Sequence, residues 1–394
     1  MTAEITRRAV LFASAAFALT FLFYGCGPPP PVPETLPARL TDQEFWDMIT
    51  DFSEPSGYFP SDNFLSNESG YQEVIPALLN TLKPGSVYIG VGPEQNFTYI
   101  VALQPKIAFI IDIRRQNMLE HLFYKALMET SADRAEFLSR LFARPRVELT
   151  ANSTPETLFR AYKLSRPVPA FFETNFRRVV EYLENEKGFK LTDQDKAGIH
   201  YVAQAFFKSG SDLSYTFIGP YDDFRRMPSY SDLMTESDGV SRNWNFLATE
   251  DQFQSIERMQ KSNLIVPLVG DFAGPKAIRS VAQYVQEHGS TVRAFYTSNV
   301  EQYLFQDHEN WKQFYDNVLF LPTDSTSTFI RYVLNGSGYG LHRTSVTSGM
   351  DYTMQVYRGG RIQDYYGLMS LSRSNDDPAT RQSRSESRHG GASR

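Results

Sequence analysis

The chain has 394 residues, enough for one large domain or two ordinary ones, and its 41% hydrophobic and 14% aromatic content can fill a substantial core. Its 39 basic and 45 acidic residues give a net charge of −6 without long runs of either sign, which excludes the basic footprint typical of nucleic-acid-binding proteins. The single cysteine, Cys26, and six scattered histidines exclude disulfide frameworks, thiolate zinc sites and HExxH metal sites.

Residues 1–26 have the pattern of an export signal. Arg7 and Arg8 precede an uncharged apolar stretch that is short for a membrane span of about 20 residues. A Gly-Cys pair then fits a lipobox, which predicts cleavage and acylation at Cys26. The paired arginines are also typical of twin-arginine export of folded chains. An uncleaved anchor helix is the alternative; in both cases the positive flank stays inside and the rest is exported.

Two flanking segments have biased composition. Residues 27–44 are rich in proline, which fixes φ and removes a hydrogen-bond donor, so we expect a semi-rigid linker. Residues 370–394 are rich in Ser, Arg, Asp and Gly and nearly lack large apolar side chains, which predicts a disordered tail. Between them we expect one α/β domain over residues 45–360.

This domain alternates apolar runs of strand length with helical patterns, which predicts a Rossmann-like, mostly parallel sheet with helices on both faces. The predicted helices cover 71–82, 118–127, 275–288 and the region around 311–315. The predicted strands cover 86–90, 106–113, 263–269, 291–297 and 318–321, followed by a late antiparallel strand over 352–357. Residues 133–261 carry helical stripes and form an insertion, which either covers the ligand edge of the sheet or only packs against it.

A glycine-containing loop follows the first predicted strand. Gly90 and Gly92 lie where the strand turns towards a helix, so backbone amides there can approach a ligand. Asp112 ends the next strand at the spacing from Gly92 where an acid accepts hydrogen bonds from ribose hydroxyls. Together they predict a nucleotide-type site; a tight turn followed by an exposed acid is the alternative.

Three more groups of polar residues follow predicted strands. Asp271 can orient or deprotonate a substrate, or cap the helix that begins near Pro275. A second group suits a polar ligand at a strand end, or a capped turn; it consists of Tyr296, Ser298, Asn299 and Glu301. A third group either binds an anion or solvates a helix face; it consists of Arg114, Arg115 and Asn117.

Several motifs carry a family resemblance over about residues 45–345. They are FPSDN (59–63), GVGPEQNFTYI (90–100), DIRRQN (112–117), VGDFAGPKA (269–277) and SNVEQYL (298–304). The chain resembles an uncharacterised bacterial family of class I S-adenosylmethionine-dependent methyltransferase-like proteins. The resemblance implies S-adenosylmethionine as cofactor, bound near Gly90, Gly92, Glu94, Asn96, Asp112 and Arg114. It also implies a catalytic Asp271 and a substrate contacted by Tyr296, Ser298, Asn299 and Glu301.

Two functions remain open at this point. The first is a methyltransferase-like protein with an S-adenosylmethionine-type cleft and an unknown acceptor. The second is an exported, membrane-tethered binding protein with a degenerate cofactor site and no turnover. Tyr88 and Glu94 favour the second, because the methyltransferase pattern has an acid and a third glycine at those positions. Both predict a small-molecule ligand, membrane attachment through the N-terminus, and neither metal nor nucleic acid.

Overall fold

The computed structural model describes residues 33–215, 227–335 and 342–376. The predicted export signal and Cys26 lie outside the described residues. Among the described residues, no helix is long and apolar enough to cross a membrane.

Within those ranges, six strands form one sheet in the order β3-β2-β1-β4-β5-β6. The strands are β1 (Val87–Gly90), β2 (Ile107–Asp112), β3 (Ile265–Val269), β4 (Val292–Ser298), β5 (Thr328–Asn335) and β6 (His342–Gly349). Neighbouring strands pair in parallel from β3 to β5, and β6 pairs antiparallel with β5. The four segments predicted to share a sheet therefore do so, and the Rossmann-like α/β fold class is confirmed.

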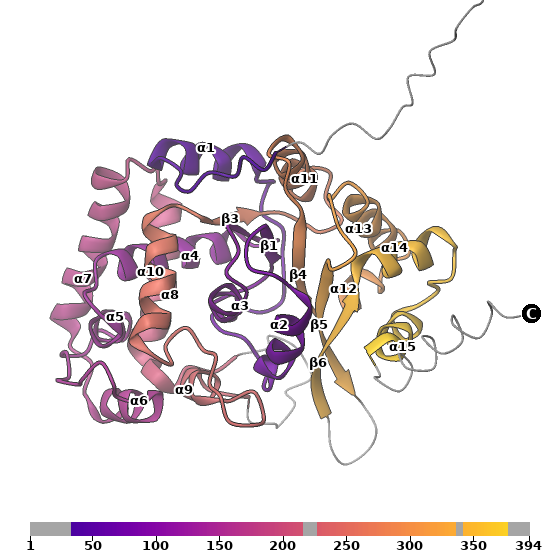
Figure 1. Cartoon of the computed structure of the whole chain (residues 1–394). Helices are drawn as coiled ribbons and strands as arrows, with labels where there is room; N and C mark the ends of the chain where they lie inside the picture. The colour runs from indigo at the N-terminus through magenta and orange to yellow at the C-terminus, as the bar shows by residue number, and fades with distance from the viewer. Residues whose placement is uncertain (1–32, 216–226, 336–341, 377–394) are drawn as a thin grey trace, which may run out of the picture. The chain divides into compact units, whose positions relative to one another are not determined.

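Helices cover both faces of the sheet (Figure 1). One face packs against α4 (Arg115–Glu129), with α3 (Gln95–Leu103), α2 (Ile75–Thr81) and α10 (Glu250–Lys261) beside it. On the other face lie α11 (Ala277–Glu287) and α13 (Asn310–Val318), with α1 (Asp42–Phe52) against α11 and β3. Because both faces are covered, β1, β2 and β3 are buried along their whole length, which explains their continuous apolar runs.

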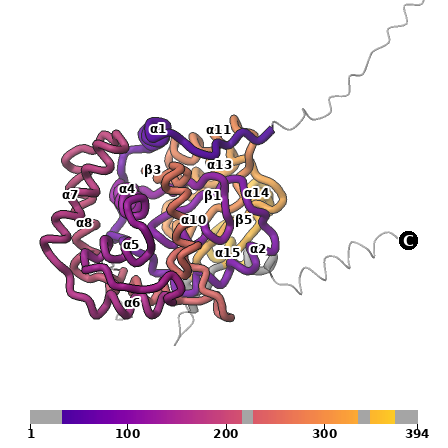
Figure 2. Tube along the Cα trace, turned by 60° about the vertical axis from the view of Figure 1, so that its left-hand side comes forward, coloured from indigo at the N-terminus to yellow at the C-terminus, as the bar shows by residue number. Residues whose placement is uncertain are grey.

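The chain between α4 and β3 is mostly helical. It contains α5 (Arg134–Leu141), α6 (Pro155–Leu164), α7 (Pro169–Glu181), the π-helical turn Tyr182–Glu186, α8 (Asp193–Ser209), α9 (Tyr230–Thr235) and α10. Helices α5, α7, α8 and α10 pack on α4, whereas α6 and α9 pack on each other. Both views place α5 to α8 far from α14 (Met350–Arg358), which follows β6 (Figures 1 and 2). Aromatic contacts such as Tyr124 with Phe206, 5.9 Å between ring centroids, join α4 to this helical segment.

Two predicted strands were wrong. Val318 ends α13 and residues 319–321 form the turn after it, whereas β5 begins at Thr328. Residues 352–357 belong to α14, where Met350, Thr353 and Met354 are buried at helical spacing. The antiparallel strand is β6, which precedes this helix; its sequence HRTSVTSG lacks the apolar alternation that would have predicted an edge strand.

The predicted limits of the domain also shift. Helix α1 begins at Asp42, inside the expected linker, because Thr41 and Glu44 form a capping box. Leu40 is buried, and its N–H donates to the carbonyl oxygen of Ser262 at 3.0 Å. At the other end, α15 (Tyr365–Asp376) continues into the segment predicted to be disordered, so that prediction was wrong for its first residues. Residues 377–394 lie outside the described residues.

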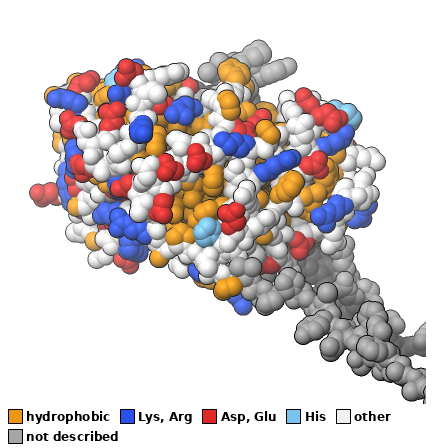
Figure 3. Space-filling model, turned by 90° about the horizontal axis from the view of Figure 1, so that it is seen from above, with side chains coloured by type: hydrophobic (Ala, Val, Ile, Leu, Met, Phe, Trp, Pro, Cys, Tyr) orange, Lys and Arg blue, Asp and Glu red, His pale blue; other side chains and the backbone are white. Residues whose placement is uncertain are grey.

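Charged groups of both signs are interspersed on the face shown in Figure 3, with hydrophobic groups between them. This mixture agrees with the small net charge of −6 and marks no single-sign field on that face.

Candidate functional site

The carboxyl ends of β1, β2 and β4 meet at one edge of the sheet, where the strand order reverses between β1 and β4. Residues 53–70 cross this edge. The N–H of Gly57 donates to the carbonyl oxygen of Ile113 at 2.8 Å, and the Ser66 N–H lies 3.5 Å from a carboxyl oxygen of Glu94. The chain's own segment therefore covers the loops in which open α/β sheets bind ligands.

The glycine loop after β1 is filled by its own side chains. Asn96 donates from Nδ2 to the carbonyl oxygens of Val91 and Pro93, at 2.9 and 2.8 Å, and its Oδ1 accepts from the Tyr88 hydroxyl at 2.8 Å. A Cβ atom at Gly90 would lie only 1.9 Å from Oδ1 of Asn96. The absent side chain of Gly90 thus makes room for Asn96.

Gly92 has a different role in this loop. Its φ of +78° belongs to the left-handed region that glycine adopts at little cost. Its carbonyl oxygen lies 3.2 Å from Nδ2 of Asn96 and 2.9 Å from Nε2 of His121. Gly92 therefore connects the loop after β1 to helix α4.

Asp112, the predicted ribose ligand, is already paired. Its Oδ1 and Oδ2 each lie 3.1 Å from a guanidinium nitrogen of Arg114, and Oδ1 also accepts from the Arg114 N–H at 2.9 Å. A second guanidinium N–H donates to the carbonyl oxygen of Ser61 at 3.1 Å. Arg114 is thus a buried tie between β2 and the crossing segment, whereas the half-exposed Arg115 pairs with Asp195 at 2.6 Å.

A buried polar cluster lies beside this loop. We call it the carboxyl-edge cluster; it consists of Glu94 and Gln95 at the start of α3 and Asn117, Glu120 and His121 in the first turns of α4. All five side chains are at most 3% exposed. The atoms without a hydrogen-bond partner among the described residues are Oε2 of Glu94, Oε1 of Gln95, Nδ2 and Oδ1 of Asn117, both carboxyl oxygens of Glu120 and Nδ1 of His121.

The surroundings shift the protonation of this cluster. Burial raises the pKa of Glu94 to about 8. Burial, with the neighbouring Glu94 as the next cause, raises the pKa of Glu120 well above its ordinary value. Burial lowers the pKa of His121 to about 4. Burial therefore favours the protonated forms of Glu94 and Glu120 and the neutral form of His121.

Two tyrosines face the same cluster. The hydroxyls of Tyr124, on α4, and Tyr230, on α9, interact with each other, and burial raises both pKa values well above the ordinary range. Both groups also lie within electrostatic reach of Glu94 and Glu120. The helical segment thus contributes Tyr230 to the cluster.

The structure places the predicted substrate residues at the end of β4 in different surroundings. The Tyr296 hydroxyl accepts from Nε2 of Gln95 at 2.8 Å, so Tyr296 adjoins the carboxyl-edge cluster. Ser298, with a φ of +53°, donates its hydroxyl to Glu68 of the crossing segment. Asn299 precedes the short helix α12 (Val300–Leu304), and its side chain interacts with Tyr303.

Glu301 lies in a separate buried network. Its carboxylate receives two bonds from the Arg331 guanidinium, at 2.5 and 3.1 Å, and one from the Tyr315 hydroxyl at 2.5 Å. The Thr297 hydroxyl donates to it at 3.2 Å, and a further guanidinium N–H donates to Ser348. We call this the Glu301 network; every polar side-chain atom of Glu301 and Arg331 has a partner.

Asp271 also lies outside the carboxyl-edge cluster. It is half-buried in the loop after β3, and its Oδ1 accepts from the N–H of Ala273 at 2.9 Å. Glu54 instead receives the N–H groups that start α11, from Lys276 at 2.7 Å and Ala277 at 2.8 Å. Asp271 therefore stabilises a turn, and neither predicted role, catalysis or helix capping, is visible in these contacts.

Across the described ranges, no group of three or more His, Cys, Asp or Glu side chains is arranged to hold a metal ion.

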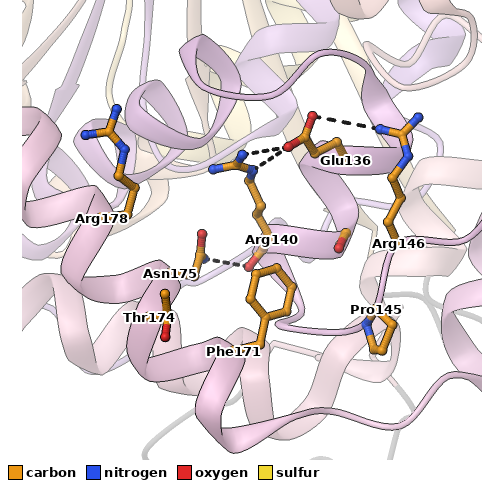
Figure 4. Close-up of a pocket in the computed structure, with 9 residues that line it drawn as sticks. Glu136, Arg140, Pro145, Arg146, Phe171, Thr174, Asn175 and Arg178 are labelled. Carbon is orange, nitrogen blue, oxygen red and sulfur yellow. Dashed lines mark hydrogen bonds and ion pairs between the residues drawn. The ribbon is translucent and has the colours of Figure 1, made fainter.

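A surface pocket of about 420 Å³ lies in the helical segment, lined by residues of α5, α7 and the loop between α5 and α6 (Figure 4). Its arginines are already paired: Arg140 with Glu136 at 2.6 Å, Arg146 with Asp133 at 2.6 Å, and Arg178 with Glu186. An anionic ligand would have to displace these carboxylates, so the pocket is a weaker candidate than the carboxyl-edge cluster.

Sequence reasoning missed most of α4 in this site. It marked the apolar stripe of α4 and placed Asn117 in a group that either binds an anion or solvates a helix face, but it made no prediction for Glu120 or His121. The helix is buried nearly all round. Asn117, Glu120 and His121 recur at i, i+3 and i+4, and this polar stripe inside an otherwise apolar helix was the available signal.

A comparison with curated proteins finds no match. One family model matches residues 63–218 and 221–391, and its description is a domain of unknown function, DUF7790. These ranges cover most of the chain, including the whole carboxyl-edge cluster and the Glu301 network. The chain belongs to the DUF7790 family.

Proposed function

We propose that the protein binds a polar small molecule at the carboxyl-edge cluster and acts as a binding protein without methyl transfer. One observation carries this proposal: polar atoms of Glu94, Gln95, Asn117, Glu120 and His121 have no hydrogen-bond partner within the described ranges. A buried polar group without a partner costs about 1 to 3 kcal/mol. A ligand that supplies the missing hydrogen bonds would offset that cost, and residues kept against stability are typical of functional sites.

The filled glycine loop argues against methyl transfer. Asn96 occupies the space beside Gly90, and Arg114 pairs with both carboxyl oxygens of Asp112. An adenosyl cofactor would have to displace both side chains before its ribose and methionine groups could be held.

Mass spectrometry of small molecules released from the purified, heat-denatured full chain tests the binding proposal. We expect a molecule that accompanies the wild type and is lost from Asn117→Leu, because the amide of Asn117 has two unpartnered atoms in the cluster. The exposed Asn152→Leu is the matched control and should retain the molecule. Equal release from wild type and Asn117→Leu, or no released molecule in either, would contradict binding at this cluster.

A methyltransferase is the second candidate, favoured by the strand order, the switch point between β1 and β4 and the position of Asp112. It predicts that the full chain binds S-adenosylmethionine with a micromolar dissociation constant, about −8 kcal/mol, in isothermal titration. It also predicts loss of that binding in Gly92→Val, because a branched side chain resists a φ of +78°. The first proposal predicts no heat of binding.

We also propose that the protein is exported and tethered through Cys26. A binding protein without a cytoplasmic cofactor suits that location better than an enzyme that needs one. Radiolabelled fatty acid should attach to the wild type and not to Cys26→Ser, and the variant should be released from the membrane fraction. Label on Cys26→Ser would exclude lipidation at this residue.

A further inference from the structure

We infer that the ligand of the carboxyl-edge cluster is a small protonated amine, an inference that rests on the proposed binding function. Its ammonium group would lie between the carboxyl groups of Glu94 and Glu120 and the amide oxygen of Asn117. An ammonium has three N–H donors and no acceptor, and most of the unpartnered atoms of the cluster among the described residues are oxygen atoms that can accept.

The charge balance around Glu120 supports a cation. Glu94, Asp112 and Asp62 all act on Glu120 electrostatically, and Arg114 is the cation among these neighbours. The Arg114 guanidinium is committed to both carboxyl oxygens of Asp112 and to backbone carbonyl oxygens of Ser61 and Asp62. Both carboxyl oxygens of Glu120 lack a hydrogen-bond partner among the described residues, so they are available to the N–H donors of a ligand.

The unpartnered amide of Asn117 and two tyrosine hydroxyls add to this argument. Asn117 is 1% exposed, and neither atom of its amide has a partner among the described residues. The phenol groups of Tyr124 and Tyr230 face the same two glutamates. A phenol hydroxyl oxygen can accept a hydrogen bond, so these groups add to the oxygen atoms that suit an N–H donor.

A metal ion fits the same cluster less well, because no metal-holding group of three His, Cys, Asp or Glu side chains occurs in the part of the chain that the structure describes. Burial raises the pKa values of Glu94 and Glu120, and a bound ammonium would favour their ionised forms.

The test measures the thermal unfolding midpoint of the full chain with ammonium, methylammonium or putrescine, each as its chloride. Sodium chloride and 1,4-butanediol, the uncharged analogue of putrescine, are the controls. A ligand that binds the folded state raises the midpoint by mass action. We expect a rise of about 2 °C or more with at least one amine and none with either control.

Variants of the cluster residues show whether an amine raises the unfolding midpoint by binding at the carboxyl-edge cluster. Glu94→Gln with Glu120→Gln keeps the shape of two protonated acids and should abolish the rise, and Asn117→Ala should lower the affinity at least about tenfold. Glu129→Gln is the control on the same helix, because Glu129 is equally buried but pairs with Lys125 at 2.5 Å; it should keep the rise. No rise with any amine, or an equal rise in the double variant, would overturn the inference.

These outcomes separate the inference from the proposed function. A neutral molecule that accompanies the wild type and is lost from Asn117→Leu would uphold binding at the cluster and overturn the amine. If no molecule accompanies the protein and no amine raises the midpoint, both proposals fail.

Discussion

The carboxyl-edge cluster and the Glu301 network are both buried acidic sites near the same edge of the sheet, but their hydrogen bonds differ. In the Glu301 network, the carboxylate meets a guanidinium and two hydroxyl groups, and every polar atom of Glu301 and Arg331 is bonded. In the carboxyl-edge cluster, both carboxyl oxygens of Glu120 and both amide atoms of Asn117 lack partners among the described residues.

The difference separates structure from function. A fully bonded buried pair fixes how strands and helices meet, because breaking it leaves an uncompensated charge. An incompletely bonded cluster contributes nothing comparable to folding and leaves its polar atoms for another molecule. Glu301 was expected to contact substrate, but its hydrogen bonds are those of a structural residue. Glu120 was not predicted to belong to the site, but its contacts are those of a binding-site residue.

The largest expected effect is at the Glu301 network. Arg331→Met should lower the free energy of unfolding by about 3 to 5 kcal/mol, because it leaves the buried Glu301 carboxylate without its cation. Urea unfolding of the full chain measures this. At the carboxyl-edge cluster, Glu120→Gln should change the same quantity by less than about 1 kcal/mol, because the Glu120 carboxyl group has no partner to lose in the part of the chain that the structure describes. Equal losses of unfolding free energy in Arg331→Met and Glu120→Gln would contradict the distinction between a structural network and a binding site.

Substitution of two equally buried asparagines should give smaller changes, of opposite sign, in the free energy of unfolding. Asn117 and Asn317 are both 1% exposed, but Asn317 donates to carbonyl oxygens of Phe272 and Gly274 and accepts from Arg279. Asn317→Leu should destabilise the fold by about 1 to 3 kcal/mol, and Asn117→Leu should leave stability unchanged or raise it. A comparable loss in Asn117→Leu would mean that its amide is bonded in the folded protein.

The pH dependence of stability gives the smallest effect. Burial raises the pKa of Glu94 to about 8 from its ordinary value of 4.5, so the protonated acid is the form that the fold favours. Its contribution to stability is complete below pH 4.5 and is lost as the pH rises through about 8.

Between pH 6 and 7, the free energy of unfolding of the ligand-free wild type should therefore fall by up to about 1.4 kcal/mol relative to Glu94→Gln. Urea unfolding of both chains at the two pH values measures this difference, and taking the difference cancels the titration of groups that both chains share, such as His121. Parallel pH profiles would show that Glu94 is not buried as an acid.

Much of the fold was predictable because buried parallel strands have a simple signature. The strands near Val87, Ile107, Ile265 and Val292 are continuous apolar runs, and each was placed to within about two residues. Strand β6 is a polar edge strand whose partner is set by tertiary contacts with β5, and α14 mimics strand alternation over a few residues. Local sequence does not distinguish a polar edge strand from a loop, or a short helix from a strand with the same alternation.

The site was predicted less completely for a related reason. Gly90, Gly92 and Asp112 do lie at the predicted edge, but a motif does not report what fills the space it opens, here Asn96 and Arg114. The presence of Glu120 in the site follows from α4 being covered by helices far along the chain, such as α8. Burial of a polar stripe depends on those distant helices.

A high-resolution crystal structure of the full chain, as purified, tests the central claim most directly. We predict non-protein density within hydrogen-bond distance of the carboxyl group of Glu120 and the amide of Asn117, and no such density at Glu301. Side chains of Glu120 and Asn117 that bond only to protein atoms or to ordered water would contradict the account.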